Sequence, residues 1–241
     1  MSHHIVEADK LHYSYPDGTT ALADISFCVT HGESVALVGE NGAGKSTLLQ
    51  HFTGCFFPSG GILKIGGLTV NKQNLSAVRR VVGMVFQNPD DQLFMPTVFE
   101  DVAFGLRNLD VPETELEGRV MRALATVGAA HLRGRPPYRL SQGEKRAAAI
   151  AGVLSMSPEI LVMDEPTSSL DPMSRRRLID ILKTFKHAKI IATHDLDFAL
   201  ELCERTIVIH KGRITADGPT REIFNDADLL KSSSLEKPRA A

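Results

Sequence analysis

One nine-residue stretch, Gly39–Thr47, constrains the fold of this chain more than any other. It reads Gly-Glu-Asn-Gly-Ala-Gly-Lys-Ser-Thr and fits the phosphate-binding pattern G-x-x-x-x-G-K-[ST] at every fixed position. Glycines let the backbone curl so that successive N–H groups point inward at an anion. Lys45 would bring a positive charge to the β- and γ-phosphates of a nucleotide, and Ser46 would offer a hydroxyl to Mg²⁺.

The residues on either side of this loop support a nucleotide site. Ser34–Val38 is a short apolar run, typical of a buried parallel strand. Thr47–Thr53 follows with helical character, and Gly54 can end that helix. The N-terminus of a helix would therefore face the phosphates. The alternative, a glycine-rich turn with a surface lysine, does not account for this strand–loop–helix order.

Length and composition limit the class of protein. A chain of 241 residues predicts one large domain, or a core with a subdomain. The net charge is −2 with acids and bases interspersed, so we expect no nucleic-acid partner. The three isolated cysteines suit a reduced compartment, and neither a disulfide framework nor a zinc spacing is present. Without a signal-like start or an 18-residue apolar run, we expect a soluble, cytoplasmic protein.

Two polar side chains follow predicted buried strands. Val81–Phe86 ends at Gln87, and Lys189–Thr193 ends at His194. Ligands of open α/β sheets bind outside the carboxyl ends of the strands, where these side chains would lie. A lone glutamine or histidine is more often structural, so each is weak evidence alone.

A third strand, Ile160–Asp164, ends in two adjacent carboxylates, Asp164 and Glu165. Burying two unpaired acids costs free energy, but beside Mg²⁺ and a phosphate both have a chemical role. We predict that Asp164 binds the metal and that Glu165 takes a proton from an attacking water.

From Pro96 to about Ser155 the pattern becomes helical. Thr97 can cap a helix over Val98–Leu106, and a second helix opens at Val111–Glu113. Ser141 and Glu144 have capping-box spacing before an alanine-rich helix. That cap is either simply a good helix start or a second helix N-terminus available to an anion.

The two ends of the chain are less informative. Residues 5–30 alternate like strands, with a turn at Pro16–Gly18. Tyr13 and Tyr15 precede that turn, where they are either packed edge aromatics or a flat face for a purine ring. The tail at 232–241 is expected to be flexible.

Taken together, these elements resemble the ATP-binding subunit of an ABC transporter. Six motifs of that family occur here in the family's order along the chain. They are the phosphate loop, the Q-loop at Gln87, the signature loop at Leu140–Glu144, Walker B at Asp164 and Glu165, the D-loop at Ser169–Asp171, and the switch histidine at His194. The signature departs from the usual L-S-G-G-Q at its third and fifth positions, Gln142 and Glu144, whereas Ser141 and Gly143 are retained.

A finer resemblance lies in the segment Val85–Phe94 and in Pro96–Gly105, which are similar to the ATPases of energy-coupling-factor importers, especially those for cobalt or nickel. Arg135–Pro137 and Ala149–Leu154 point the same way. This resemblance implies a membrane partner whose coupling helices carry arginine, received in a groove near Asp90 and Asp91.

The resemblance implies a RecA-like α/β core at 1–87 and 158–231, with an antiparallel β edge and a helical subdomain inserted at 88–157. It also implies a homodimer, or a dimer with a close paralogue, peripheral on the cytoplasmic side of the membrane, with ATP and Mg²⁺ as cofactors. The residues expected to contact ATP are Tyr15, Gly39, Glu40, Asn41, Gly42, Ala43, Gly44, Lys45, Ser46, Thr47 and Gln87. Those expected to hold Mg²⁺ are Ser46, Gln87 and Asp164, and those expected to act in catalysis are Lys45, Glu165 and His194. Four signature residues are expected to reach the ATP of the other subunit: Ser141, Gln142, Gly143 and Glu144.

Three other classes stay open. A vitamin importer of the same type would share these motifs. A non-transport ABC ATPase usually carries two such modules or long insertions, which this chain lacks. A phosphate-loop kinase or GTPase would not need the signature loop or His194.

Overall fold

The computed structural model describes residues 4–168 and 170–238. Its centre is a six-stranded sheet whose strands from β9 to β6 are parallel, with β10 added antiparallel at one edge. The order across the sheet is β10 (Arg213–Pro219), β9 (Arg205–His210), β3 (Ser34–Val38), β8 (Ala188–Ala192), β7 (Ile160–Asp164) and β6 (Val82–Val85). Every residue of β3, β7 and β8 is buried, as expected for parallel strands covered on both faces.

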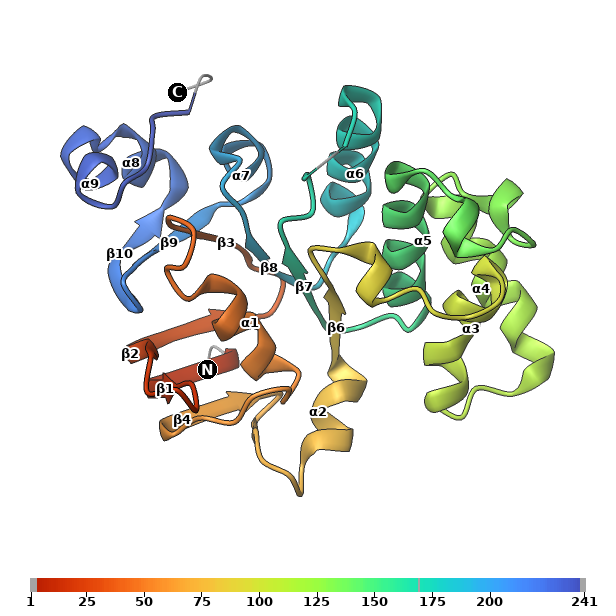
Figure 1. Ribbon diagram of the computed structural model, residues 1–241, viewed down its shortest axis with the longest axis horizontal. Helices are drawn as coiled ribbons and strands as arrows, with labels where there is room; N and C mark the ends of the chain where they lie inside the picture. The colour runs from red at the N-terminus through yellow and green to blue at the C-terminus, as the bar shows by residue number, and fades with distance from the viewer. Residues whose placement is uncertain (1–3, 169, 239–241) are drawn as a thin grey trace.

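One face of this sheet is covered by a second, antiparallel sheet and by α1 (Lys45–Phe52), as Figure 1 shows. Val35 and Leu37 of β3 point into this layer, whereas Ala36 and Val38 point into the opposite one. The second sheet runs β2 (Thr20–Thr30), β1 (His4–Ser14), β4 (Gly60–Ile65) and β5 (Leu68–Thr69), and α2 (Leu75–Val81) leads from it to β6.

The chain between β6 and β7 forms a helical lobe at one side of the molecule (Figure 1). It contains η1 (Pro89–Asp91), α3 (Val98–Asn108), α4 (Glu113–Thr126), η2 (Ala130–Leu132), η3 (Pro137–Arg139) and α5 (Gln142–Ser155). The opposite face of the sheet and the C-terminal part carry α6 (Pro172–Thr184), α7 (Leu196–Leu202), α8 (Thr220–Asn225) and α9 (Ala227–Ser232). The predicted α/β core with an antiparallel edge and an inserted helical lobe is confirmed.

Local caps explain where the helices of the lobe begin. The Thr97 side chain accepts a hydrogen bond from the Glu100 N–H, so α3 starts as predicted. Ser141 and Glu144 form the full capping box at the start of α5. Gly128 adopts φ 72° just after α4, which allows the chain to turn there.

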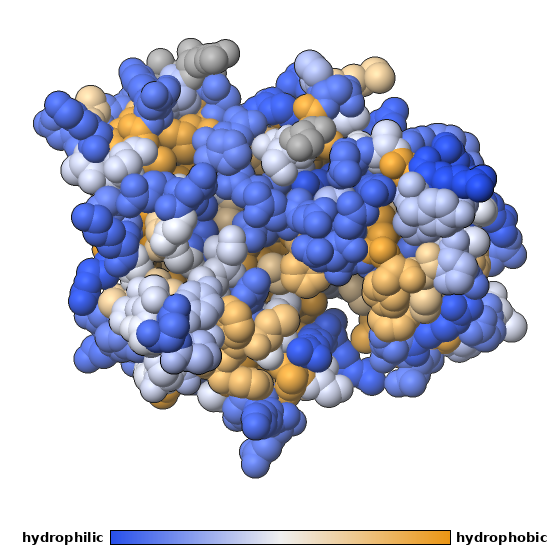
Figure 2. Space-filling model, in the orientation of Figure 1, coloured by the Kyte–Doolittle hydropathy of each residue, from blue (hydrophilic) through white to orange (hydrophobic). Residues whose placement is uncertain are grey.

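The surface and the end of the chain complete the picture. The face in Figure 2 is largely polar, with apolar side chains in separate patches, one of them over the helical lobe. Within 4–168 and 170–238, no helix has the length and apolar character needed to cross a bilayer. The tail expected to be flexible is described as far as residue 238, and there Ser233 is buried and Leu235 packs against the core.

Candidate functional site

A cleft of about 840 Å³ opens at the carboxyl ends of the parallel strands. It brings together most of the residues predicted to bind nucleotide or to act on it: Tyr15, all nine of Gly39–Thr47, Gln87, Glu165 and His194. The sequence analysis missed other lining residues, namely Thr19, Thr20, Ala21, Leu196, Ser234, Leu235 and Glu236. A volume of this size suits a nucleotide.

Two glycines fix the path of the phosphate loop. Gly39 passes so close to β9 that a Cβ there would lie 2.1 Å from the carbonyl oxygen of Ile209. Gly44 is the N-cap of α1 with φ 105°, and a Cβ would lie 2.6 Å from the carbonyl oxygen of Ala21. Because no other residue fits either position, the loop is held with its N–H groups at the start of α1.

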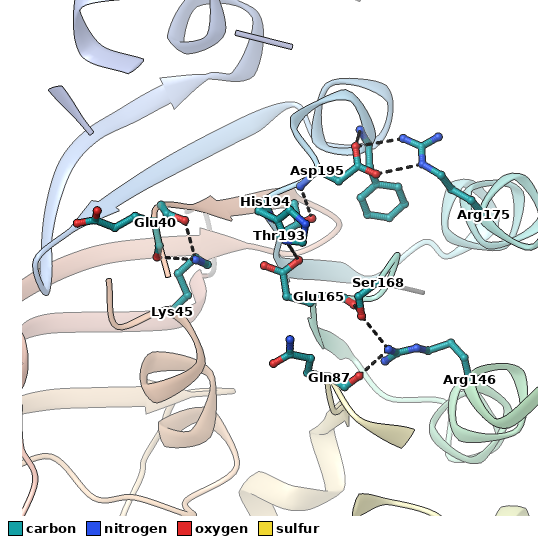
Figure 3. Close-up of polar contacts among 12 residues, drawn as sticks. Glu40, Lys45, Gln87, Arg146, Glu165, Ser168, Arg175, Thr193, His194 and Asp195 are labelled. Atoms are coloured by element: carbon teal, nitrogen blue, oxygen red, sulfur yellow. Dashed lines mark hydrogen bonds and ion pairs between the residues drawn. The ribbon is translucent and has the colours of Figure 1, made fainter. Parts of the chain in front are cut away.

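Lys45 is buried at the base of this loop. Its Nζ donates to the carbonyl oxygens of Gly39 at 2.7 Å and Glu40 at 3.0 Å (Figure 3). Burial lowers the pKa of Lys45, and the nearby carboxylates, Glu165 first, oppose that shift. The Lys45 ammonium group is thus held by two neutral carbonyl oxygens. Negatively charged phosphate oxygens can replace them and would form stronger, charge-assisted hydrogen bonds with it.

Asp164 has the chemistry of a metal ligand. It is 6% exposed, its Oδ1 has no hydrogen-bond partner among the described residues, and the nearby Ser46 side chain favours its charged form. Burial raises the pKa of Asp164. A buried carboxylate oxygen next to a hydroxyl fits a hard divalent cation such as Mg²⁺, which prefers oxygen ligands.

Glu165 and His194 contact each other at the back of the cleft (Figure 3). The His194 Nδ1 lies 2.7 Å from Oε2 of Glu165, and the His194 main-chain N–H donates to the same oxygen at 3.2 Å. Glu165 adopts φ 46°, which is left-handed and rare for a side chain of this kind. Strain of this kind clusters at functional sites.

Arg146 was not singled out from the sequence, yet it connects two loops at the cleft, those that hold Gln87 and Ser168 (Figure 3). It lies on α5 and is 4% exposed. Its guanidinium donates to the carbonyl oxygens of Phe86 at 2.7 Å and Gln87 at 2.5 Å, and to Oγ of Ser168 at 3.1 Å. Ser168 Oγ in turn donates to the carbonyl oxygen of Glu165 at 3.0 Å. The start of α5 is thereby tied to Gln87 and to Glu165.

Tyr15 lies in the cleft, and both its hydroxyl and its ring contact other residues of the chain. The hydroxyl shares a hydrogen bond of 2.7 Å with Oγ1 of Thr47, and the ring meets Tyr13 and Phe56 edge-on. These contacts orient the ring beside α1. The stacking of a purine on Tyr15 stays a prediction.

The signature residues are not in this cleft. Ser141, Gln142, Gly143 and Glu144 line a separate cavity of about 430 Å³ between α5 and α6. Ser169 of the D-loop lies outside the described residues, whereas Asp171 caps α6 by accepting from the N–H groups of Met173 and Ser174. Within one chain, therefore, the signature loop and the phosphate loop do not share a site.

The two acids expected in a partner groove differ in position. Asp91 lines a groove of about 210 Å³ on the helical lobe. Asp90 is not among the residues that line this groove, and its Oδ1 lies 2.6 Å from Nζ of Lys145. Their roles toward a partner stay predictions.

Comparison with known proteins decides the family. The sequence profile of the ABC transporter family matches residues 22–168, more than half of the chain. The chain belongs to the ABC transporter family. The predicted resemblance to the ATP-binding subunit of an ABC transporter is thereby confirmed.

Relatives and solved structures agree with this assignment. A protein of Geobacter sulfurreducens, named provisionally as an ABC transporter ATP-binding protein, is 61% identical over 99% of this chain and 96% of its own. The energy-coupling factor transporter ATP-binding protein EcfA of Methanothermobacter thermautotrophicus is 48% identical over 98% of this chain and 78% of its own.

Two solved structures share the fold. CbiO1 of Clostridium perfringens, described as part of the ABC transporter complex cbiONQ, is 39% identical with a TM-score of 0.82, covering 98% of this chain and 97% of its own. The ATP-binding cassette MJ0796, a dimer in a post-hydrolysis state with ADP and Pi, is 25% identical with a TM-score of 0.81, covering 90% and 99%. This ABC domain is accordingly an ATP-binding ATPase.

Proposed function

We propose that this chain is the ATP-hydrolysing subunit of an ABC importer of the energy-coupling-factor type, with cobalt or nickel as its cargo. Support comes from the relatives named EcfA, from the likeness to CbiO1, and from the segment Val85–Phe94. A vitamin importer of the same type is the alternative, because the cargo itself does not touch this subunit. The chain would act at the cytoplasmic face of the membrane, bound to integral membrane subunits.

The groove beside the Q-loop is the observation that carries the link to a membrane partner. Phe94, in the loop before α3, is 63% exposed, and Phe104, on α3, is 38% exposed; their ring centroids lie 5.0 Å apart. Asp91 and Asp101 line the same groove, and Oδ2 of Asp101 is buried without a hydrogen-bond partner among the described residues. Exposed aromatic rings beside the Asp91 carboxylate suit a partner helix that carries apolar side chains and arginine.

This groove adjoins the nucleotide site through two consecutive residues. Phe86 lines the groove, and Gln87 lines the nucleotide cleft. The carbonyl oxygens of both accept hydrogen bonds from Arg146. A shift of Gln87 toward a bound nucleotide would therefore move the wall of the groove, which is the kind of coupling a transport ATPase needs.

In the proposed mechanism, two such chains, or this chain and a close paralogue, face each other head to tail. Lys45 and the N-terminus of α1 hold the β- and γ-phosphates, while Ser141 and Gly143 of the other subunit present the N-terminus of α5 to the same ATP. Ser46, Asp164 and Gln87 would hold Mg²⁺, which neutralises charge on the phosphates.

Hydrolysis then requires a base and an oriented water. Glu165 takes the proton from the water that attacks the γ-phosphate in line. His194 holds the Glu165 carboxylate through the two contacts described above. ATP closes the dimer, hydrolysis lets it reopen, and these movements drive the membrane subunits.

The test is to co-express the chain with any integral membrane proteins encoded in the neighbouring reading frames and to measure uptake into cells. We expect the chain to co-purify with them and to drive uptake of Co²⁺ or Ni²⁺ that the Glu165→Gln variant abolishes. Uptake of a vitamin but of neither metal would favour the alternative cargo. An absence of any complex with membrane proteins would contradict a role in transport.

A further inference from the structure

The signature loop of this chain carries a negative charge directly beside its serine. Oε2 of Glu144 accepts hydrogen bonds from the Ser141 main-chain N–H at 2.8 Å and from the Ser141 hydroxyl at 2.9 Å. These bonds, followed by the charges of Arg135 and His131, hold the pKa of Glu144 below its usual range. The carboxylate is therefore ionised at neutral pH.

This arrangement conflicts with the binding of a second anion at the same place. A carboxylate in the first turn is favourable for α5 alone, because the N-terminus of a helix attracts negative charge. In the proposed dimer, however, the same helix end must receive the triphosphate held by the other subunit. The Ser141 hydroxyl has one proton, so while it donates to Glu144 it cannot also donate to a phosphate oxygen.

Arg135 is placed to relieve this conflict. Its Nη1 lies 3.4 Å from Oε1 of Glu144, the carboxylate oxygen that Ser141 does not use. Its Nη2 donates to the carbonyl oxygen of Arg139 at 3.2 Å, which fixes the guanidinium against the loop before α5. Arg135 thus brings a positive charge to Glu144 from the side away from Ser141.

We propose that Arg135 is a positioning residue for the shared ATP site: it neutralises Glu144, so that Ser141 and the N-terminus of α5 can bind the triphosphate held by the second subunit. This inference rests on the proposed head-to-tail dimer. Glu144 occupies the fifth position of the signature loop, where the family usually has a neutral glutamine. In this chain, the positive charge of Arg135 would compensate for the negative charge of Glu144.

A double-mutant cycle tests the proposal. The parent is the Glu165→Gln protein, in which ATP is bound but not consumed, and the readout is its dimerisation constant with Mg²⁺ and ATP by sedimentation. We expect Arg135→Ala to weaken dimerisation by about tenfold or more, because an uncompensated unit charge would then lie close to the phosphates. In a Glu144→Gln background, where the capping box survives but the charge is gone, we expect Arg135→Ala to change the constant by less than about twofold.

The neighbouring Arg133 supplies the matched control. It lies in the same loop, 3.1 Å from Glu117, and does not contact the signature residues. Arg133→Ala should leave dimerisation unchanged, and thermal melts of all variants should agree closely because both arginines are half-exposed.

The outcomes separate the two proposals. Equal weakening by Arg135→Ala in both backgrounds would mean that Arg135 supports the loop and does not act through Glu144, and no weakening in either would also overturn the inference. A parent protein that stays monomeric at saturating ATP and high protein concentration would overturn the shared site itself, and the role of Arg135 with it.

Discussion

His194 makes two contacts with one carboxylate oxygen of Glu165. Its ring Nδ1 lies 2.7 Å from Oε2, and its main-chain N–H donates to the same atom at 3.2 Å. The Glu165 side chain is 8% exposed, whereas the His194 side chain is 65% exposed. The acid is consequently held in place by a residue that itself remains open to the cleft, and a ligand there can contact His194 without first displacing Glu165.

If Glu165 is the general base, its replacement by glutamine should stop the chemistry and preserve binding. We expect Glu165→Gln to lower steady-state ATP hydrolysis by ~10²–10⁴-fold. Equilibrium binding of ATP should remain, because the phosphate loop and Lys45 are untouched. The measurement is phosphate release beside nucleotide titration, and turnover within about a factor of three of the parent would remove Glu165 from this role.

His194 should act through Glu165 and not independently of it. We expect His194→Ala to lower turnover by about tenfold or more, because the Glu165 carboxylate loses the contact with Nδ1 and keeps only the one with the main-chain N–H of residue 194. The variant that carries both His194→Ala and Glu165→Gln should then be no slower than Glu165→Gln alone. If the two losses multiply in the double variant, His194 has a separate role, for instance toward the γ-phosphate.

The sequence predicted the central residues of the cleft because parallel strands deliver their carboxyl ends to one edge of a sheet. Gln87, Glu165 and His194 each follow such a strand and line the cleft, and Asp164 ends β7 directly before Glu165. The phosphate loop was found from spacing alone. Only its helix start was misjudged, since α1 begins at Lys45 and not at Thr47, capped by a glycine in a left-handed conformation.

Contacts between distant parts of the chain could not be predicted in this way. Arg146 is an ordinary arginine in an alanine-rich helix, and its partners Phe86, Gln87 and Ser168 are 60, 59 and 22 residues away. The short helices α2 and α7 were missed because seven residues carry too little periodicity to stand out. Val81 in particular was assigned to a strand but ends α2.

Ser168 offers a mild test of the network that Arg146 makes. Ser168→Ala removes the hydroxyl that accepts from Arg146 and donates to the carbonyl oxygen of Glu165, while it leaves the arginine bonded to Phe86 and Gln87. We expect a loss of about 1 kcal/mol in the free energy of unfolding. We also expect turnover to fall several-fold with little change in the KM for ATP, because Glu165 loses its alignment but the phosphate site does not.

A matched control is Ser232→Ala, since the Ser232 hydroxyl bonds to the carbonyl oxygen of Leu229 at 2.9 Å on an exposed helix outside the cleft. That variant should leave turnover unchanged. A Ser168→Ala protein with parental turnover would show that the Arg146 network supports folding alone.

The last prediction concerns coupling to the membrane partner. Asp91 lines the groove beside Phe94, whereas Asp90 is paired with Lys145 at 2.6 Å, so the two acids should now behave differently. Asp91→Ala should leave the thermal melt and ATP binding by the free subunit intact. It should weaken assembly with the membrane subunits, because a charge pair that loses water at a protein interface can be worth ~2–5 kcal/mol when one side is truncated.

Asp90→Ala is the matched control for Asp91→Ala. The Asp90–Lys145 pair is half-exposed on the acidic side, so its loss should cost only ~0–1 kcal/mol of stability. Its effect on assembly should be smaller than that of Asp91→Ala, because Lys145 already neutralises this acid. Pull-down of the membrane subunits and uptake assays, run beside thermal melts, measure both variants. Unchanged assembly in the Asp91→Ala protein would refute its place in the partner groove, and a collapsed melt would mean that this acid supports the fold of the Q-loop, where Asn88 donates to it at 3.3 Å.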